Sequence, residues 1–253
     1  GRAEEYLKMA AAAGAELAAL PETFNYIGRD MKGAAETLQG ETVTRLSELA
    51  RSLQLWIHCG SLTEANPAGK PYNTSLLLDP AGHIAACYRK LHLFDIDEVG
   101  TLSFRESASI AAGSEIVTVQ TPLAGLGLGI CYDLRFCELF RLEALAGAEV
   151  FILPASFTAV TGRAHWKTLL RARAIENACY ILAPAQCGRK EKYTAYGHTL
   201  AADPWGRVLT EAGNEPGVYF VNLQPDCLLQ TRKQIPALKN RRTDLYSLEK
   251  KQN

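Results

Sequence analysis

The 253-residue sequence lacks net charge and long apolar runs. Its 27 Lys and Arg residues balance 27 Asp and Glu residues, so no field of one sign favours nucleic acid or anionic lipid. No apolar run approaches the ~20 residues that span a bilayer. The run MAAAAGAELAAL leads into Pro21 and does not have the pattern of a secretory signal. The sequence therefore predicts no nucleic-acid partner and no membrane partner.

The seven cysteines lack any C-x-x-C pair and any cluster with histidine at the spacing of a zinc site. Most of them lie in apolar runs, as Cys59 does in LWIHCGSL and Cys179 does in ACYILAPA. Such thiols are typical of small buried side chains in a reducing compartment. We therefore expect a cytoplasmic protein without structural disulfides.

Strand-like apolar runs alternate with amphipathic stretches along the chain. We expect helices over residues 3–13, 33–52, 135–146, 163–177 and 225–234. We expect strands over residues 15–20, 53–62, 74–79, 84–89, 114–121, 125–132, 148–155, 179–186, 196–203 and 217–223. Continuously apolar runs such as EVFIL are typical of strands covered on both faces, and the tetrads in DPAGHI and DPWGRV predict hairpins. The pattern predicts one domain with a layered, mixed α/β fold.

Cys131 ends the glycine-spaced run GLGLGICY, and charged residues follow at once. Gly125, Gly127 and Gly129 permit close backbone approach and a tight exit from the strand. A thiol on a sharp strand-to-helix turn projects outward, where backbone N–H groups can stabilise an oxyanion. This placement makes Cys131 a candidate nucleophile, with a buried structural cysteine as the alternative.

Two more side chains of suitable chemistry follow apolar strands. Glu22 comes after LAALP, at a strand's carboxyl end, where the sites of α/β proteins gather. Lys90 follows the predicted strand 84–89. Taken singly, Glu22 is better explained as a solvated loop glutamate, and a surface lysine is the alternative for Lys90. Together with Cys131 they supply the base, cation and thiol that acyl transfer from nitrogen requires, and we expect Lys90 to favour the thiolate.

Five segments resemble the nitrilase superfamily of carbon–nitrogen hydrolases: LPETF, YRKLHLFD, GICYDLRFCEL, TGRAHWKTLLRARAIEN and YGHTLAADPWG. The resemblance covers nearly the whole chain, as far as NRRTDLY. It is strongest to the amidase branch that includes omega-amidase and deaminated glutathione amidase. The segment LFDIDEVGTLSFRES resembles the first of these, whereas LLRARAIEN followed by AQCGR resembles the second.

The resemblance implies a single-domain α/β fold of the nitrilase-like type, a four-layer-forming α-β-β-α sandwich that assembles into a homodimer or a higher homo-oligomer. It implies Glu22 as general base, Lys90 as oxyanion stabiliser and Cys131 as nucleophile. The backbone N–H of Tyr132 is a second expected oxyanion donor. Glu106, in SFRES, is expected to position the lysine or assist proton transfer. The implied chemistry needs no metal and no organic cofactor.

The first strand of the family has no counterpart ahead of the predicted helix 3–13. We therefore expect residues 1–253 to form one carbon–nitrogen hydrolase domain that lacks this strand. Its absence would leave a neighbouring strand with unpaired backbone groups.

Substrate recognition is predicted from three further residues. Arg135 can pair bidentately with a carboxylate at the far end of the substrate, with a structural ion pair as an equal alternative. Phe157 and Thr158 are candidate pocket residues. The sequence thus predicts hydrolysis of a small carboxylate-bearing amide through a cysteine thioester, with release of ammonia or an amine. The alternatives are a nitrilase or N-carbamoyl hydrolase with the same triad, or a catalytically inert scaffold.

Overall fold

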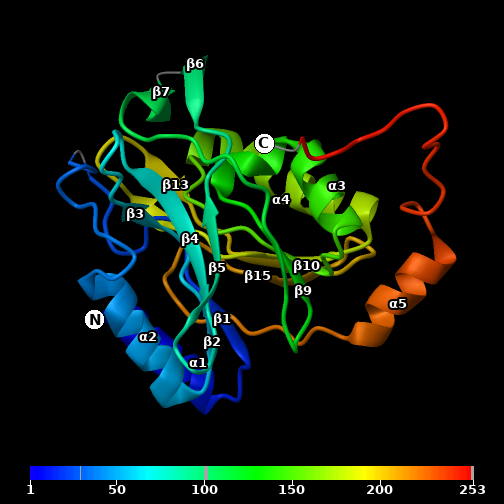
Figure 1. Cartoon of the computed structure of the whole chain (residues 1–253), viewed down its shortest axis with the longest axis horizontal. Coiled ribbons are helices and arrows are strands. Elements are labelled where there is room, and N and C mark those ends of the chain that lie inside the picture. Colours follow the sequence, from blue (N-terminus) through cyan, green and yellow to red (C-terminus); the bar gives the residue numbers. More distant parts are fainter. Residues whose placement is uncertain (29, 100–101, 252–253) are drawn as a thin grey trace.

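The computed structural model describes residues 1–28, 30–99 and 102–251, and it places two sheets between two pairs of helices (Figure 1). Gly100 and Thr101, in the segment that resembles omega-amidase, lie outside the described residues. Within the described ranges, no helix has the length and apolar character needed to cross a membrane.

The first sheet comes from the N-terminal half of the chain. Its strands run in the order β1 (Leu17–Ala19), β2 (Trp56–His58), β4 (Tyr72–Leu78) and β3 (Leu62–Glu64), and β5 (Ile84–Arg89) also pairs with β4. β1 and β2 are parallel, whereas β4 is antiparallel to β2, β3 and β5. Helices α1 (Arg2–Ala12) and α2 (Glu41–Leu53) pack on the outer face of this sheet.

The second sheet comes from the C-terminal half. Its order is β15 (Val208–Glu211), β14 (Leu200–Ala202), β11 (Tyr180–Ala183), β10 (Val150–Ile152), β9 (Gly125–Leu128) and β8 (Thr118–Gln120). Its central strands β9, β10 and β11 are parallel, and helices α3 (Cys137–Leu145) and α4 (Ala159–Asn177) pack against them. Two small hairpins, β6 (Asp95–Val99) with β7 (Leu102–Arg105) and β12 (Cys187–Arg189) with β13 (Thr194–Tyr196), complete the strands described.

Side chains on the first sheet alternate between two cores. On β4, Leu76 and Leu78 pack with the residues of α1 and α2, whereas Leu77 packs with the core of the second sheet. On β5, Cys87 and Tyr88 divide in the same way. Because successive side chains of a strand point to opposite faces, this sheet is covered on both sides. The layers are therefore α, β, β and α, and the predicted fold class is confirmed.

Both predicted hairpin turns form, and they have the same construction. Asp79 accepts a hydrogen bond from the backbone N–H of His83 at 2.8 Å, and Gly82 adopts a φ of 80°. Asp203 caps the second turn in the same way, and Gly206 has a φ of 82°. The carboxylate organises the turn while the glycine adopts the left-handed backbone.

Three predicted elements differ in the structure. The run 53–62, predicted as one strand, divides into the end of α2, the strand β2 and the start of β3. The strand predicted over residues 217–223 is absent, since none of the described strands pairs with this segment and an extended segment becomes a strand only through pairing. The helix predicted over 33–52 begins later, at Glu41, since residues 31–40 form turns that end at Gly40.

β1 pairs with β2 alone among the described strands, so its second edge is unpaired. The strand residues Leu17, Ala18 and Ala19 line one groove of about 480 Å³ together with Val218 and Phe220. The free edge of β1 and the irregular segment 217–223 therefore face the same space.

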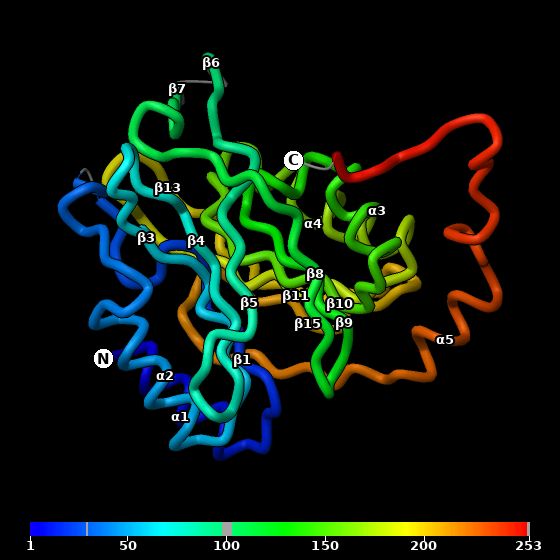
Figure 2. Tube along the Cα trace, viewed as in Figure 1, coloured from blue at the N-terminus to red at the C-terminus, as the bar shows by residue number. Residues whose placement is uncertain are grey.

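Helix α5 (Pro225–Gln234) and the residues after it run away from the sheets and return toward α3 (Figure 2). Arg232 anchors the helix by donating to the carbonyl oxygens of Ala178 at 3.1 Å and Ala148 at 2.8 Å. Near the end of the described chain, Lys250 forms an ion pair with Glu115.

Candidate active site

The nucleophile turn is built as the sequence predicts. β9 ends at Leu128, and a short 3₁₀ helix, η2 (Cys131–Arg135), begins at the thiol residue itself. Cys131 has a φ of 49°, a backbone conformation that residues other than glycine rarely adopt and that is frequent at functional sites. Its backbone N–H donates to the carbonyl oxygen of Pro154 at 2.9 Å. This bond ties the turn to the end of the neighbouring strand β10.

Asp133 holds the other side of this turn. Its buried carboxylate accepts hydrogen bonds from the backbone N–H of Ile130 at 2.8 Å and from the hydroxyl of Tyr88 at 2.6 Å. It also contacts Nδ1 of His92 at 2.7 Å. The His92 ring stacks on Phe136 with 3.6 Å between centroids. Asp133 thereby links the strand β5 of the first sheet to the turn that carries the thiol.

Glu22, Lys90 and Glu106 form a carboxylate–lysine cluster beside this turn. Lys90 Nζ lies 3.0 Å from Glu22 Oε1, 3.1 Å from Glu106 Oε1 and 2.9 Å from Glu106 Oε2. Lys90 is only 2% exposed. Burial alone lowers the pKa of Lys90, but the charges of Glu106 and Glu22 outweigh it and raise the pKa well above its ordinary value. The ammonium therefore stays charged.

Glu22 is directed toward the thiol by its other contacts. Its Oε2 accepts the backbone N–H of Ser156 at 2.8 Å, and its Oε1 accepts Nδ2 of Asn73 at 3.0 Å. The charge of Glu22 is among the causes that raise the pKa of the Cys131 thiol, so the two groups interact. Glu22 is thus held in place from both sheets beside the thiol.

The expected thiolate is not the resting state of this site. Burial raises the pKa of Cys131 well above that of an ordinary thiol, and the negative charge of Glu22 adds to the shift. The positive charge of Lys90 acts in the opposite direction but does not outweigh them. Lys90 therefore favours the thiolate, as expected, but it also pairs with two carboxylates and its effect is smaller than that of burial and Glu22. A base is needed to activate the thiol.

Two groups lie where an oxyanion donor is expected. Each contact that Lys90 Nζ makes in this state is to a carboxylate oxygen, so the ammonium must release one contact to reach a substrate oxygen. The backbone N–H of Tyr132 has no hydrogen-bond acceptor within the described ranges. Of the two expected donors, Tyr132 is the one already free.

Arg135 lies across two aromatic rings next to the cluster. Its guanidinium carbon is 5.7 Å from the ring centroid of Tyr132 and 5.4 Å from that of Phe157. Its Nη1 is 3.2 Å from Nδ1 of His165, and no carboxylate within the described ranges forms an ion pair with it. The structural ion pair that was the alternative for Arg135 is thus absent there, and Phe157 lies beside the arginine.

Thr158, a candidate pocket residue, lies at the start of α4. It is the N-cap of this helix, and its hydroxyl accepts the backbone N–H of Thr161 at 3.3 Å. The side chain also contacts the hydroxyl of Thr161 at 3.0 Å. Both contacts stabilise the first turn of the helix.

Three site residues were not predicted from the sequence. Asn73 and Ser156 donate to Glu22, and Tyr193 lies 2.6 Å from Ser156 through their hydroxyl oxygens. None of them belongs to a local motif of its own. They contribute because β4, β10 and the hairpin β12–β13 meet at Glu22, which only the tertiary structure shows.

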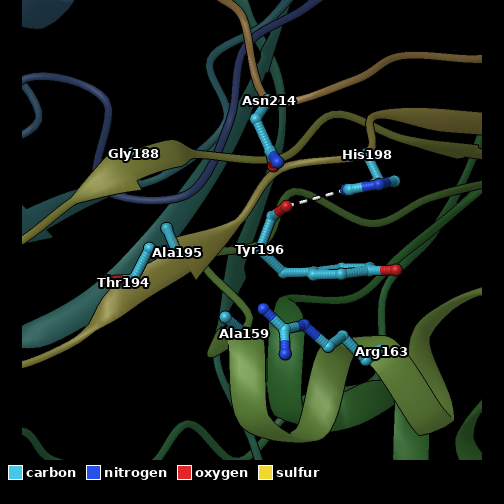
Figure 3. Close-up of a pocket in the computed structure, with 8 residues that line it drawn as sticks. All are labelled: Ala159, Arg163, Gly188, Thr194, Ala195, Tyr196, His198 and Asn214. Atoms are coloured by element: carbon cyan, nitrogen blue, oxygen red, sulfur yellow. Dashed lines mark hydrogen bonds between the residues drawn. The ribbon is translucent and has the colours of Figure 1, made fainter.

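A separate cavity of about 370 Å³ lies at the start of α4 (Figure 3). Its lining residues are Ala159, Arg163, Gly188, Thr194, Ala195, Tyr196, His198 and Asn214. The lining offers an arginine and two stacked rings but neither a thiol nor a carboxylate, so the cavity lacks the groups that acyl transfer requires. The described residues also contain no cluster of three His, Cys, Asp or Glu side chains able to hold a metal ion.

Comparison with known proteins places this geometry in a family. The sequence signature of the carbon-nitrogen hydrolases matches residues 1–233. The chain is similar to omega-amidase NIT2 of Homo sapiens, with 40% identity over 99% of this chain and 91% of the relative. It is 42% identical to a deaminated glutathione amidase of Synechocystis sp., over 94% of this chain and 90% of the relative.

The solved structure of the C. elegans NitFhit protein superimposes with a TM-score of 0.91 and 38% identity. The match covers 97% of this chain but 61% of that longer chain, so it concerns only that part of NitFhit. Since the signature, the full-length relatives and the superposition agree, the chain belongs to the carbon-nitrogen hydrolase family.

Proposed function

We propose that this protein is a cysteine-dependent amidase that hydrolyses a small carboxylate-bearing amide. The observation that carries the proposal is the position of Glu22, which contacts both Lys90 and the Ser156 N–H and whose charge helps to raise the pKa of the Cys131 thiol. A neutral thiol with a buried carboxylate beside it is suited to proton transfer at the moment of attack. Relatives that carry the names omega-amidase and deaminated glutathione amidase support this reaction class.

The first half of the reaction forms a thioester. Glu22 takes the proton from Cys131 as the sulfur attacks the amide carbonyl carbon. The carbonyl π bond opens, and the Tyr132 N–H and Lys90 stabilise the resulting oxyanion; one such donor typically contributes ~10²–10³ in rate. When the tetrahedral intermediate collapses, the C–N bond breaks. The leaving nitrogen takes the proton from Glu22 and departs as ammonia or an amine.

The second half hydrolyses the thioester with the same groups. Glu22 takes a proton from water, and the water oxygen attacks the thioester carbonyl carbon. The C–S bond then breaks, and the sulfur recovers a proton from Glu22. The products are a carboxylic acid and the neutral resting thiol. Lys90 stays charged throughout, because Glu106 remains paired with it.

We propose Arg135 as the partner of the substrate's distal carboxylate. Its guanidinium is half-buried, lies over the rings of Tyr132 and Phe157, and has no acidic partner in the part of the chain that the structure describes. Both rings adjoin the reaction centre in sequence, since Tyr132 follows Cys131 and Phe157 follows Ser156. A charged guanidinium without a carboxylate favours an anionic ligand.

Ammonia release from succinamate, α-ketoglutaramate and deaminated glutathione tests the proposal. Wild-type protein should hydrolyse at least one of them, and Cys131→Ala should lose activity by about 10⁴-fold or more. Hydroxylamine should trap the acyl group as a hydroxamate, and intact-mass spectrometry should find the adduct on Cys131. Turnover of a nitrile or an N-carbamoyl compound alone would identify another branch. No turnover and no adduct would favour an inert scaffold.

We also propose that the protein is a cytoplasmic homodimer or higher homo-oligomer. All seven cysteines are free, which supports a reducing compartment. The outer face of α4 exposes Val160 and Ile175, and Trp205 is exposed in the turn beside Ile175. Exposed apolar side chains on one face favour contact with a second copy.

A further inference from the structure

Asn73 joins the two carboxylates of the carboxylate–lysine cluster. Its Nδ2 donates to Glu22 Oε1 at 3.0 Å and to Glu106 Oε1 at 3.4 Å. Its backbone carbonyl accepts the N–H of Lys90 at 2.9 Å. Asn73 lies on β4 and is 3% exposed. One buried residue thus contacts all three members of the cluster.

The orientation of the Asn73 amide is fixed by the chemistry of its neighbours. Ionised carboxylates accept hydrogen bonds and do not donate them, so the amide nitrogen must face Glu22 and Glu106. The amide oxygen, Oδ1, is left buried without a hydrogen-bond partner in the described ranges. Because an orphaned buried acceptor destabilises the fold, the two bonds from Nδ2 are what this side chain contributes.

The cluster needs such a donor for an electrostatic reason. Glu22 and Glu106 share a single ammonium, so the like charges of the two carboxylates repel each other. A hydrogen bond to the charged form of a carboxylate favours that form. The amide has two N–H groups, one for each carboxylate. It therefore offsets the repulsion between the two carboxylates next to the same lysine.

We infer that Asn73 is a positioning residue that holds Glu22 aimed at the Cys131 thiol, while Glu106 anchors Lys90. The inference rests on the proposed amidase function, because it assigns Glu22 as the base. The inference assigns different roles to the two carboxylates. Glu106 also accepts the backbone N–H of Phe94 at 2.6 Å, whereas Glu22 reaches across to the second sheet through Ser156.

The test is the pH dependence of kcat/KM in Asn73→Leu, which keeps the volume and removes both N–H groups. The acidic limb of this profile, where kcat/KM falls at low pH, reports protonation of the base. Loss of the donor should move this limb to higher pH by about one to two units and lower kcat/KM about 10–100-fold near the wild-type limb. An unmoved limb would overturn the inference. If the leucine variant does not fold, Asn73→Ala should show the same shift.

Asn177 provides a matched control. It is fully buried, its Nδ2 donates to the carbonyl oxygen of Arg173 at 3.0 Å, and its Oδ1 also lacks a partner in the described ranges. Asn177→Leu should lose stability but keep the wild-type limb. An equal shift in both variants would show that any buried asparagine change moves the profile, and would overturn the role of Asn73.

Alkylation of Cys131 by iodoacetamide separates this inference from the amidase proposal. The rate needs no amide turnover, and its acidic limb should follow ionisation of Glu22 and shift upward in Asn73→Leu. A wild-type protein that hydrolyses no amide but shows this shift would refute the amidase function and keep the positioning role. A wild-type protein that hydrolyses amides without any shift in the variant would do the reverse.

Discussion

Glu143 is a fully buried carboxyl group beside the strand that leads to Cys131. A Cβ atom at Gly127 would lie 2.7 Å from its Oε2, so the glycine provides the space for it. Neither oxygen of Glu143 has a hydrogen-bond partner in the described ranges. Burial, and then the charge of Asp133, raises the pKa of Glu143 well above its ordinary value. The group is therefore held as a neutral acid.

This neutral acid makes stability depend on pH. Since the pKa of Glu143 is higher in the folded protein, the unfolded chain releases its proton first, and the free energy of unfolding falls as pH rises above about 4.3. Glu143→Gln removes this loss. In urea unfolding from pH 5 to pH 8, the free energy of unfolding of this variant should rise relative to that of wild type by up to about 1.4 kcal/mol per pH unit.

The exposed Glu138 on the same helix serves as the control for this experiment. Its change to Gln should leave the pH dependence of unfolding close to that of the wild type. Parallel stability curves for wild type and Glu143→Gln would contradict a buried neutral acid at position 143.

Arg135 is expected to determine the preference for an acidic substrate. Arg135→Lys keeps the charge but loses the planar pair of donors. Expressed as a free energy of activation, the loss in kcat/KM should be about 1.5–3 kcal/mol larger for succinamate than for butyramide, which has no distal carboxylate. Steady-state ammonia release measures both. Equal losses on the two substrates would instead assign Arg135 to the support of Tyr132 and Phe157.

Thr158 acts at the scale of an element, as the cap of the longest described helix, α4. Thr158→Ala should lower the free energy of unfolding by about 1 kcal/mol, the usual effect of losing a cap, whereas Thr158→Ser should change it little. KM for the best substrate should be unchanged in both variants. A raised KM in Thr158→Ala without loss of stability would instead support the pocket role expected for this threonine from the sequence.

The sequence predicts an element well where its signal is local. The Asp79 and Asp203 turns carry both their carboxylate and their glycine within a few residues, so both hairpins follow from the sequence. The segment 217–223 has the apolar pattern of a strand, but pairing depends on a neighbour that the pattern cannot reveal. The strands β12 and β13 are three residues each, which is too short for a periodicity to be recognised.

The same limit applies to the reaction centre. Glu22, Lys90 and Cys131 each follow a strand, so their place at strand ends and their chemistry are readable. Glu106 was found only through resemblance, since its segment has no distinctive composition. Asn73 lies inside β4, where a polar residue gives no sign of function; its role depends on β4 lying between the strands that lead to Glu22 and Lys90.

At the scale of the whole molecule, the exposed face of α4 should hold two copies together. Ile175→Glu places a charge among the apolar side chains of this face, next to the turn of Trp205. Light scattering after size exclusion should find at least twice 27.6 kDa for wild type and 27.6 kDa for the variant. Leu123→Glu changes an exposed leucine on another surface and should leave the mass of the assembly unchanged.

The reaction centre is divided between the two sheets. Catalysis therefore requires the two halves of the chain to be assembled, and activity reports their proximity. The carboxylate–lysine cluster lies entirely before Gly113, and the nucleophile turn lies entirely after it. A chain opened after Gly113 gives two fragments, one with the base and the cation and the other with the thiol. Neither fragment can complete a turnover by itself. The rate of ammonia release from a mixture of the two would therefore measure how much of the protein has reassembled. This makes the enzyme a candidate split reporter for the association of partners fused to the new ends.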